Sequence, residues 1–212
     1  MKLIDKSIKE FSKVLASEEP APGGGSTAAL GGALGAALLC MVASLTLGRA
    51  RYAEHEPFMK EALKFANNMR LRMLDIIDRD TEAYNAVSAV FAMPKDTEKQ
   101  KETRSSAMQE ALKACTLTPF ELIECTYMAL QLADDMAGKY NINAASDFGV
   151  AVLNLKAAAQ GAWLNVLINL DGIKDEIFSA KYILSGNELM HAITELSDDI
   201  YAEILRKLLP KM

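Results

Sequence analysis

One aspartate stands where a helix would place an apolar side chain. Asp80 lies three residues after Ile77 and four before Tyr84, on the apolar line of its segment. Burying an unpaired charge is costly, so a carboxylate here must have a partner or a function. Burial would raise its pKa, and a nearby cation would lower it. We therefore consider two interpretations, a group that transfers protons and one half of a structural ion pair with Arg104 or Lys95.

A row of polar residues runs along the segment 144–170, which otherwise consists mainly of Val, Leu and Ala. Steps of three and four residues place the row on one helix face. Lys156 is the one charge between the flanking aspartates, so this face is not expected to point to water. We expect it to line a polar pocket, and the alternative is a hydrogen-bond network between helices. The row comprises Asp147, Asn154, Asn165 and Asn169, preceded by Asn143 and Ser146, which are alternatively helix caps.

A run of three glycines, Gly23, Gly24 and Gly25, precedes Ser26 and opens an apolar segment. Glycines let a backbone approach a ligand closely, and the free N–H groups at a helix start favour an anion. The run is neither a Walker A loop nor a dinucleotide fingerprint. The alternative is a flexible hinge in which Ser26 only caps the helix.

Two cations are placed to hold an anionic group. Arg104 lies four residues before Met108, on the inward line of its helix, and its guanidinium could clamp a carboxylate. Lys95 follows Pro94 at a junction between helices. The alternatives are an Arg104 side chain that extends to water from a helix end, and a solvated loop lysine at position 95.

The elements that must position these groups are helices, with almost no strand-like alternation. The third has an apolar line that includes Phe65, Tyr84 and Phe91. Pro94 ends it, and Pro119 is expected to kink the fourth. The pattern predicts helices over about 4–15, 26–47, 56–93, 96–132, 144–170 and 189–208.

Two of these helices, in segments 23–48 and 144–170, are nearly uncharged and need cover on all sides. Amphipathic helices supply that cover in a single all-α domain, a helical bundle over residues 1–212 with the two uncharged helices at its centre. Gly31, Gly32 and Gly35 let neighbouring backbones come close. A glycine and alanine face of this kind also favours packing against a second copy, so we expect a homodimer.

The composition argues against several classes of protein. A formal charge of −5 without a basic run makes nucleic acid an unexpected partner. The three scattered cysteines indicate reduced thiols in a cytoplasmic protein, and no spacing predicts a metal site. Segment 23–48 is long enough to cross a bilayer, but its glycines and alanines favour a buried central helix over a membrane span.

Several motifs in order resemble one known family. They are PGGGSTAALGGALGAALLC over 22–40 with MVASLTLGR over 41–49, DTEAYNAV over 80–87, MPK over 93–95, Arg104, NAASDF over 143–148 and NVLINLD over 165–171. Together they resemble the cyclodeaminase domain of formiminotransferase-cyclodeaminase, and equally the stand-alone bacterial methenyltetrahydrofolate cyclohydrolases of the same family. The likeness covers about residues 4–174.

The resemblance implies an all-α dimer that uses no metal or cofactor and takes a folate substrate with an anionic, possibly polyglutamylated, tail. The transferase domain of the bifunctional relatives has no counterpart in these 212 residues. Two reactions are implied, hydrolysis of the methenyl bridge of tetrahydrofolate and formation of that bridge with loss of ammonia. The alternative is a folate-binding or scaffold bundle without catalysis.

Both reactions need a group that takes a proton and one that gives a proton. We assign these roles to Asp80 and Asp147. Amides would hold the pterin edge, Tyr84 would stack on the ring or orient an aspartate, and the triple glycine and the cations would hold the tail carboxylates. The expected substrate-binding residues are Gly23, Gly24, Gly25, Ser26, Tyr84, Lys95, Arg104, Asn143, Ser146, Asn154 and Asn165.

Overall fold

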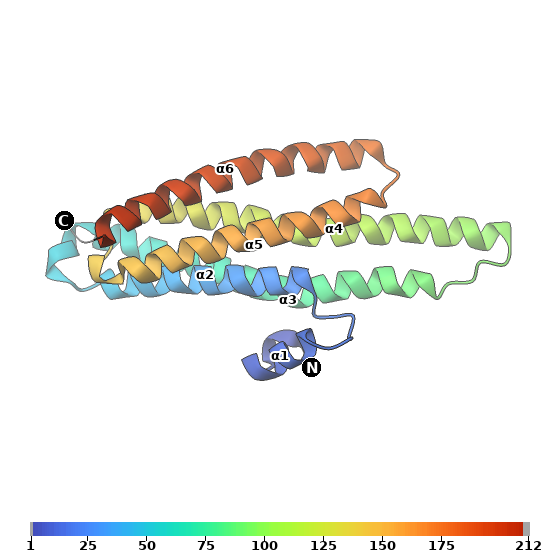
Figure 1. The fold of residues 1–212 in the computed structure, drawn as a ribbon, viewed down its shortest axis with the longest axis horizontal. Helices are drawn as coiled ribbons and strands as arrows, with labels where there is room; N and C mark the ends of the chain where they lie inside the picture. The colour runs from blue at the N-terminus through green and yellow to red at the C-terminus, as the bar shows by residue number, and fades with distance from the viewer. Residues whose placement is uncertain (1, 210–212) are drawn as a thin grey trace.

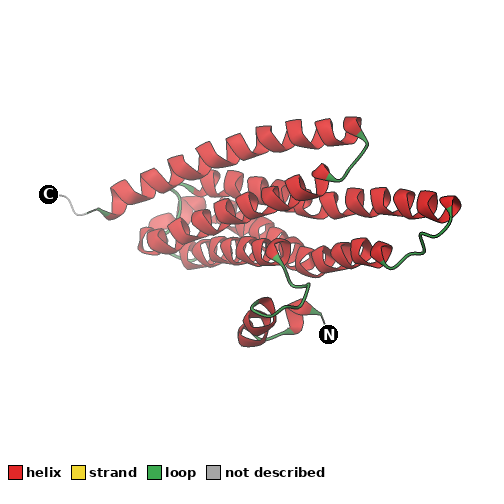
Figure 2. Cartoon of the chain, turned by 45° about the vertical axis from the view of Figure 1, so that its right-hand side comes forward, coloured by secondary structure: helices red, strands yellow, loops and turns green. Residues whose placement is uncertain are grey.

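Long helices joined by short turns make up the chain, as the sequence predicts (Figure 2). The computed structural model describes residues 2–209, and no strand occurs among them. The all-α class is therefore confirmed. The helices are α1 (Ile8–Leu15), α2 (Gly24–Thr46), α3 (Glu56–Phe91), α4 (Glu98–Met136), α5 (Ala145–Asp171) and α6 (Glu176–Leu208), with the 3₁₀ turns η1 (Leu3–Asp5), η2 (Ala50–His55) and η3 (Ile142–Ala144).

Helices α2 to α5 run alternately up and down and form the bundle, and α6 lies across α4 and α5 (Figure 1). The short α1 lies outside this bundle, beside the start of α2. The buried carboxylate of Asp78 on α3 holds that N-terminal segment, because its Oδ1 accepts the backbone N–H of Leu3 at 2.6 Å.

The two nearly uncharged helices are the central ones, as predicted: α2 packs against α3 and α5, and α5 packs against α2, α4 and α6. Close approach explains two of the glycines. A Cβ added at Gly35 would lie 2.9 Å from the carbonyl oxygen of Ala151, and one added at Gly32 would lie 3.0 Å from the sulfur of Met73. Helix α2 is long and apolar enough to cross a membrane, with a mean hydropathy of 2.0, yet half of that stretch is buried inside the bundle.

Three boundaries differ from the sequence-based expectation. The first helix is split into η1 and α1, because Ser7 caps α1 in a capping box with Glu10. Helix α4 contains Pro119, as expected, and ends at Met136, four residues later than predicted. Helix α6 begins 13 residues earlier than predicted, at Glu176, where the Asp175 side chain accepts the N–H of Phe178 as its cap.

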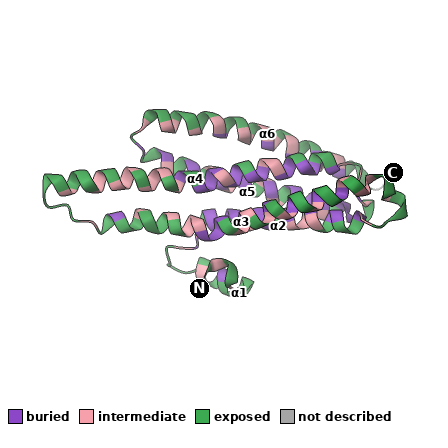
Figure 3. Cartoon of the chain, turned by 180° about the vertical axis from the view of Figure 1, so that it is seen from behind, coloured by how far each residue is buried: buried purple, intermediate pink, exposed green. Residues whose placement is uncertain are grey.

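The hairpin of α3 and α4 extends beyond the ends of the other helices (Figure 1). Side chains near its tip are mostly exposed, while buried residues concentrate where five helices overlap (Figure 3). The predicted apolar line of α3 is therefore wrong at Tyr84 and Phe91, which are 43 % and 65 % exposed, because α4 alone lies beside this stretch. It is also wrong at Phe65, which is 41 % exposed.

The packing of α6 on α5 gives a stability prediction. Gly186 leaves room for the single tryptophan, and a Cβ added there would lie 2.1 Å from the Trp163 ring. We expect Gly186→Ala to lower the free energy of unfolding by about 1–3 kcal/mol, since overpacking outweighs the gain in helix propensity. Urea unfolding followed by Trp163 fluorescence measures this. The exposed neighbour Asn187 provides the control Asn187→Ala, and equal stability of the two variants would contradict the prediction.

Candidate active site

Asp80 lies at the point where α3 passes the first turn of α2. Its Oδ2 accepts a hydrogen bond from the Ser26 hydroxyl at 2.9 Å. Burial raises the pKa of the Asp80 carboxyl, and hydrogen bonds from the side chain and backbone of Ser26 oppose that rise without cancelling it. The carboxyl is thus biased towards keeping a proton.

The alternative of a structural ion pair does not fit the contacts. Arg104 donates its Nε–H to the carbonyl oxygen of Val90 at 3.1 Å, at the end of α3. Within residues 2–209, no cation lies within 4.0 Å of the Asp80 carboxylate. The neighbouring Arg79 pairs instead with Asp75 and Glu121. Asp80 is therefore a half-buried carboxyl without a charged partner in this part of the chain.

The triple glycine is neither a hinge nor a loop that Ser26 caps. Gly23 is the N-cap, and Gly24 to Ser26 already form the first turn of α2. Ser26 is fully buried and turns its hydroxyl to α3, so the expectation that it caps the helix is wrong. A Cβ added at Gly25 would lie 2.1 Å from Asp80 Oδ1, so only glycine lets α2 start against this carboxyl. The first N–H groups of a helix have no partner within it and favour an anion.

Helix α5 brings amides to the other side of the same turn. A Cβ at Gly24 would lie 3.5 Å from the Asn165 side-chain nitrogen, which donates to the Gly161 carbonyl at 2.8 Å. Asn169, one turn further, donates to the carbonyl of Cys115 on α4 at 3.0 Å. Cys115 is close enough to Asp80 for that charge to raise its pKa, after the larger effect of burial.

Four helices thus meet around the start of α2. We call this arrangement the Asp80 cluster, and it brings together one carboxyl, two amides, one hydroxyl and one thiol. Sequence analysis missed Cys115, which we took for an ordinary core thiol; its position on α4 gave no polar signal. The cluster comprises Gly24, Gly25, Ser26, Asp80, Cys115, Asn165 and Asn169.

Asp147 lies elsewhere. It sits in the first turn of α5, 18 residues before Asn165, which corresponds to about 27 Å along the helix. Asn143 and Ser146 lie at the same end, near η2. The expectation that Asp80 and Asp147 converge within one chain is therefore wrong, because one helix face can run the full length of a bundle. Asn143 lines a pocket there of about 500 Å³ together with Arg49, Arg51, Tyr52 and Asn141.

Asn154 lies between the two ends. Its amide donates to the Val150 carbonyl at 2.9 Å and borders an open groove of about 340 Å³ between α2 and α5. The groove floor consists of small residues and reaches Gly24 of the Asp80 cluster. The predicted polar row therefore lies on one face of α5, but its residues lie at three separate places: the pocket near η2, the groove between α2 and α5, and the Asp80 cluster.

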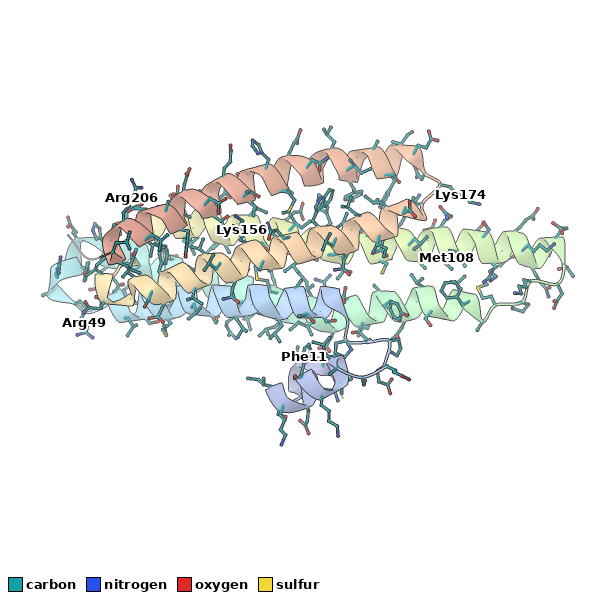
Figure 4. All side chains as sticks on the ribbon, viewed as in Figure 1. Phe11, Arg49, Met108, Lys156, Lys174 and Arg206 are labelled. Carbon is teal, nitrogen blue, oxygen red and sulfur yellow. The ribbon has the colours of Figure 1, made fainter. Side chains whose placement is uncertain are left out.

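The predicted cations Lys95 and Arg104 do come together. They line a pocket of about 290 Å³ with Lys101, Lys174 and the exposed Phe91, near the tip of the α3–α4 hairpin. Lys174 and Met108 mark this end of the molecule in Figure 4, and Arg49 marks the opposite end. Arg104 lies 11 residues before Cys115 on α4, which places this pocket about 16 Å from the Asp80 cluster. Tyr84 lies on α3 between the two.

The raised pKa of Asp80 predicts a dependence of stability on pH. A carboxyl whose pKa is higher in the folded state favours folding while it is protonated, and this contribution is lost as the pH rises through the folded value. Asp80→Asn removes the ionisation, so the variant should melt at a higher temperature than the unaltered chain at pH 7. The difference should shrink towards about pH 4, near the ordinary pKa of aspartate. A variant that is less stable at pH 7 would contradict burial as the dominant effect.

Comparison with known proteins places this arrangement in a family. The model described as formiminotransferase-cyclodeaminase matches residues 7–184. The chain is 36% identical over 203 residues to the methenyltetrahydrofolate cyclohydrolase of Methylorubrum extorquens, covering 96% of this chain and 98% of that protein. It is 32% identical over 179 residues to the formimidoyltransferase-cyclodeaminase of Rattus norvegicus, covering 84% of this chain and 33% of that protein.

A solved structure agrees with the sequence matches. The crystal structure of formiminotetrahydrofolate cyclodeaminase from Thermotoga maritima matches with a TM-score of 0.80 at 29% identity, over 96% of both chains. The chain spans about a third of the bifunctional rat protein but nearly all of the bacterial relatives. The family model and the nearly full-length match to the cyclohydrolase carry the same conclusion: the chain belongs to the formiminotransferase-cyclodeaminase family.

Proposed function

We propose that the protein is a one-carbon folate enzyme in which Asp80 transfers protons at the carbon that bridges N5 and N10 of tetrahydrofolate. The observation that carries the proposal is the Asp80 carboxyl itself, which is half-buried, has a raised pKa and lies at the start of α2 beside two amides. A carboxyl whose pKa is raised is better matched to taking and giving a proton than an ordinary aspartate. The relatives named for two folate reactions support the substrate class.

The first candidate reaction is cyclohydrolysis, the activity named for the relative matched over 98% of its length. Water adds to the cationic methenyl carbon, and Asp80 takes one of its protons. The adduct then forms a formyl group on N10 as the bond from carbon to N5 breaks, and N5 receives a proton. One proton is released overall. An ionised carboxylate beside the cationic carbon also stabilises its charge.

The second candidate is cyclodeamination, the activity named for the matched crystal structure. N10 adds to the formimino carbon and gives up its proton. The departing nitrogen receives that proton and one from solvent, and ammonia leaves as the carbon–nitrogen bond breaks. Both reactions need a group at the same carbon that takes a proton at one step and gives a proton at another.

We assign the anionic tail of the folate to the pocket near the hairpin tip. Lys95 and Arg104 line it with Lys101 and Lys174, and no acidic residue borders it. Lys101 pairs with Glu98 at 2.7 Å, while the Arg104 guanidinium keeps further N–H donors beyond the one that Val90 accepts. Tyr84 lies between this pocket and Asp80, where it can stack on an aromatic ring of the substrate. The start of α2, Gly23 to Gly25, and Asn165 would hold the pterin end.

The second carboxylate requires a second copy of the chain. The outer face of α2 and α5, which we call the α2/α5 face, is uncharged and carries exposed apolar side chains beside the small-residue groove. We propose that this face packs on itself in a homodimer. The face comprises Thr27, Gly31, Leu34, Met41, Leu45, Val150, Leu153, Asn154, Ala157, Leu164 and Ile168.

A two-fold axis through this face would exchange its two ends. Ala157 lies close to the middle of the stretch between Asp147 and Asn165, so an axis there places Asp147, Ser146 and Asn143 of one copy over the Asp80 cluster of the other. Two-fold interfaces are self-complementary in this way. The arrangement would give each dimer two sites, each with one carboxylate from either copy.

The remaining assignments follow from the substrate class. We propose a cytoplasmic enzyme that needs no metal or cofactor besides its folate substrate and that binds neither nucleic acid nor membrane. Relatives that are metabolic enzymes and the packing of α2 inside the bundle support this. A folded protein that binds folate without turnover would instead be a binding or scaffold bundle.

Two substrates test the function directly. Purified protein should speed the loss of near-ultraviolet absorbance of methenyltetrahydrofolate if it is a cyclohydrolase. Formiminotetrahydrofolate should instead give a rise in that band and free ammonia if it is a cyclodeaminase. Asp80→Asn should lower turnover about 100-fold or more, because a missing proton-transfer group costs that much. Asp134→Asn, an exposed position on α4, is the control. Full activity of the Asp80 variant would reject the assignment.

Co-expression tests the shared site. Asp80→Asn and Asp147→Asn chains with different tags, purified together as a mixed dimer, should recover about half of the unaltered activity, since one of the two sites then has both carboxylates. Each variant alone should be nearly inactive. No recovery in the mixed dimer would show that both carboxylates must belong to one chain, whereas full activity of Asp147→Asn alone would show that Asp147 has no role. Light scattering and sedimentation establish that the dimer forms.

A further inference from the structure

The Ser26 hydroxyl has two acceptors on α3 and is shielded from solvent. It lies 3.0 Å from the carbonyl oxygen of Ile77 and 2.9 Å from Oδ2 of Asp80, and its residue is fully buried. The Thr81 hydroxyl is 3.4 Å away. A bulk water molecule cannot replace any of these contacts at a fully buried residue.

A serine hydroxyl has one proton to donate and two lone pairs to accept with. When Asp80 is ionised, the Ser26 proton can point to Oδ2. When Asp80 is protonated, its own O–H can donate to Ser26 Oγ, and the Ser26 proton then points to the Ile77 carbonyl. Both states are fully hydrogen-bonded, and they differ by one proton on Asp80 and by rotation of one hydroxyl. Ser26 keeps its own proton throughout, and the proton that Asp80 takes or gives comes from or goes to the substrate or solvent.

We propose that Ser26 is a positioning residue whose hydroxyl turns between Ile77 and Asp80 as Asp80 takes and gives its proton. The inference deepens the proposed function, because it names the group that lets one carboxyl serve both steps. It replaces the expectation that Ser26 contacts the substrate. The exchange itself is a property of the protein without ligand.

The proposal has an energetic basis in the cost of unpaired buried groups. The Ser26 backbone N–H is a fixed donor to Asp80 and favours the carboxylate alone, whereas a fixed acceptor would favour the acid. Leaving a buried donor or acceptor unpaired costs about 1–3 kcal/mol. A hydroxyl that serves both states avoids that penalty in each, and its hydrogen bond to the charged carboxylate is the stronger of the two.

The groups that surround Asp80 leave this role to Ser26. On α4, the Cys115 thiol has a pKa raised by burial and by Asp80, so it stays neutral through the range in which a carboxyl titrates. On α5, Asn165 and Asn169 carry no charge. On α3, Arg79 is held by Asp75 and Glu121. The first turn of α2 has no ionisable side chain.

Carbon-13 NMR of the protein without ligand tests the exchange. In the unaltered chain, the Ile77 carbonyl shift should titrate with the same midpoint as the Asp80 carboxyl, because the hydroxyl leaves one as the other ionises. A flat Ile77 shift across the Asp80 titration would overturn the proposal. This readout needs neither substrate nor turnover, so it fails or succeeds independently of the proposed function.

Substitution gives the second measurement. Ser26→Ala removes the donor to the carboxylate and should raise the Asp80 midpoint by about one unit, a tenfold change in the ionisation constant. The pH–rate profile should move in the same direction, and Ser26→Thr should restore both. Ser44→Ala, at an exposed position on the same helix, is the matched control and should change neither. An Asp80 midpoint that stays the same in folded Ser26→Ala would show that Ser26 only ties α2 to α3.

Discussion

The contact between the first turn of α2 and the Asp80 carboxyl constrains the rest of the molecule. Because Gly25 has no side chain, the helix backbone can begin against Oδ1 of Asp80, and Ser26 can reach Oδ2. Close packing against α3, α4 and α5 explains Gly25, Gly32 and Gly35, whereas a Cβ added at Gly31 would meet nothing within 4 Å. Each glycine inside a helix costs about 1 kcal/mol of helix propensity relative to alanine. The cost is offset by packing that a larger residue would prevent, as at Gly35 against the Ala151 carbonyl.

The same contact decides the electrostatics of the site. Burial favours the neutral acid, whereas the hydrogen bonds from Ser26 and the positive end of the α2 dipole favour the carboxylate. A helix end is worth about 0.3–1 kcal/mol to a nearby charge, and one unit of pKa corresponds to about 1.4 kcal/mol, so these effects reduce the influence of burial, which remains the largest. A carboxyl balanced in this way suits a reaction that must take and give a proton at one carbon. An ion pair with Arg104 would have fixed the ionised form, and Arg104 instead serves the end of α3.

Helix periodicity predicted much of the fold and part of the site. It gave the long helices, the two uncharged central ones and the out-of-place Asp80, since these depend on local pattern. Periodicity failed where the position of a residue along the helix axis matters. Asp147 and Asn165 share a face of α5 but lie about 27 Å apart, because a period of 3.6 residues identifies the face of a helix and not the place along it. Periodicity also failed for Ser26, because a serine at this place suggests a helix cap until its burial against α3 is known. It failed for Tyr84 and Phe91 because the sequence does not show that the α3–α4 hairpin extends beyond the other helices.

One chain therefore offers one carboxyl at the centre where the chemistry requires two proton transfers. Two ways to meet that requirement are built from different parts of the molecule. In the proposed exchange, the Ser26 hydroxyl would let Asp80 act twice, and in the proposed dimer, the uncharged α2/α5 face would let a second copy bring Asp147. The Ser26 exchange and the dimer are compatible. The exchange would act inside the α2–α3 contact, and the dimer would act across the outer groove, which reaches the same turn of α2 at Gly24. If Asp80 alone exchanges the protons, Asp147 would serve to stabilise the cationic carbon, a role that needs charge and proximity but no matched pKa. Both carboxylates are half-buried, and burial raises the pKa of Asp80, which fits its proton-transfer role in that division.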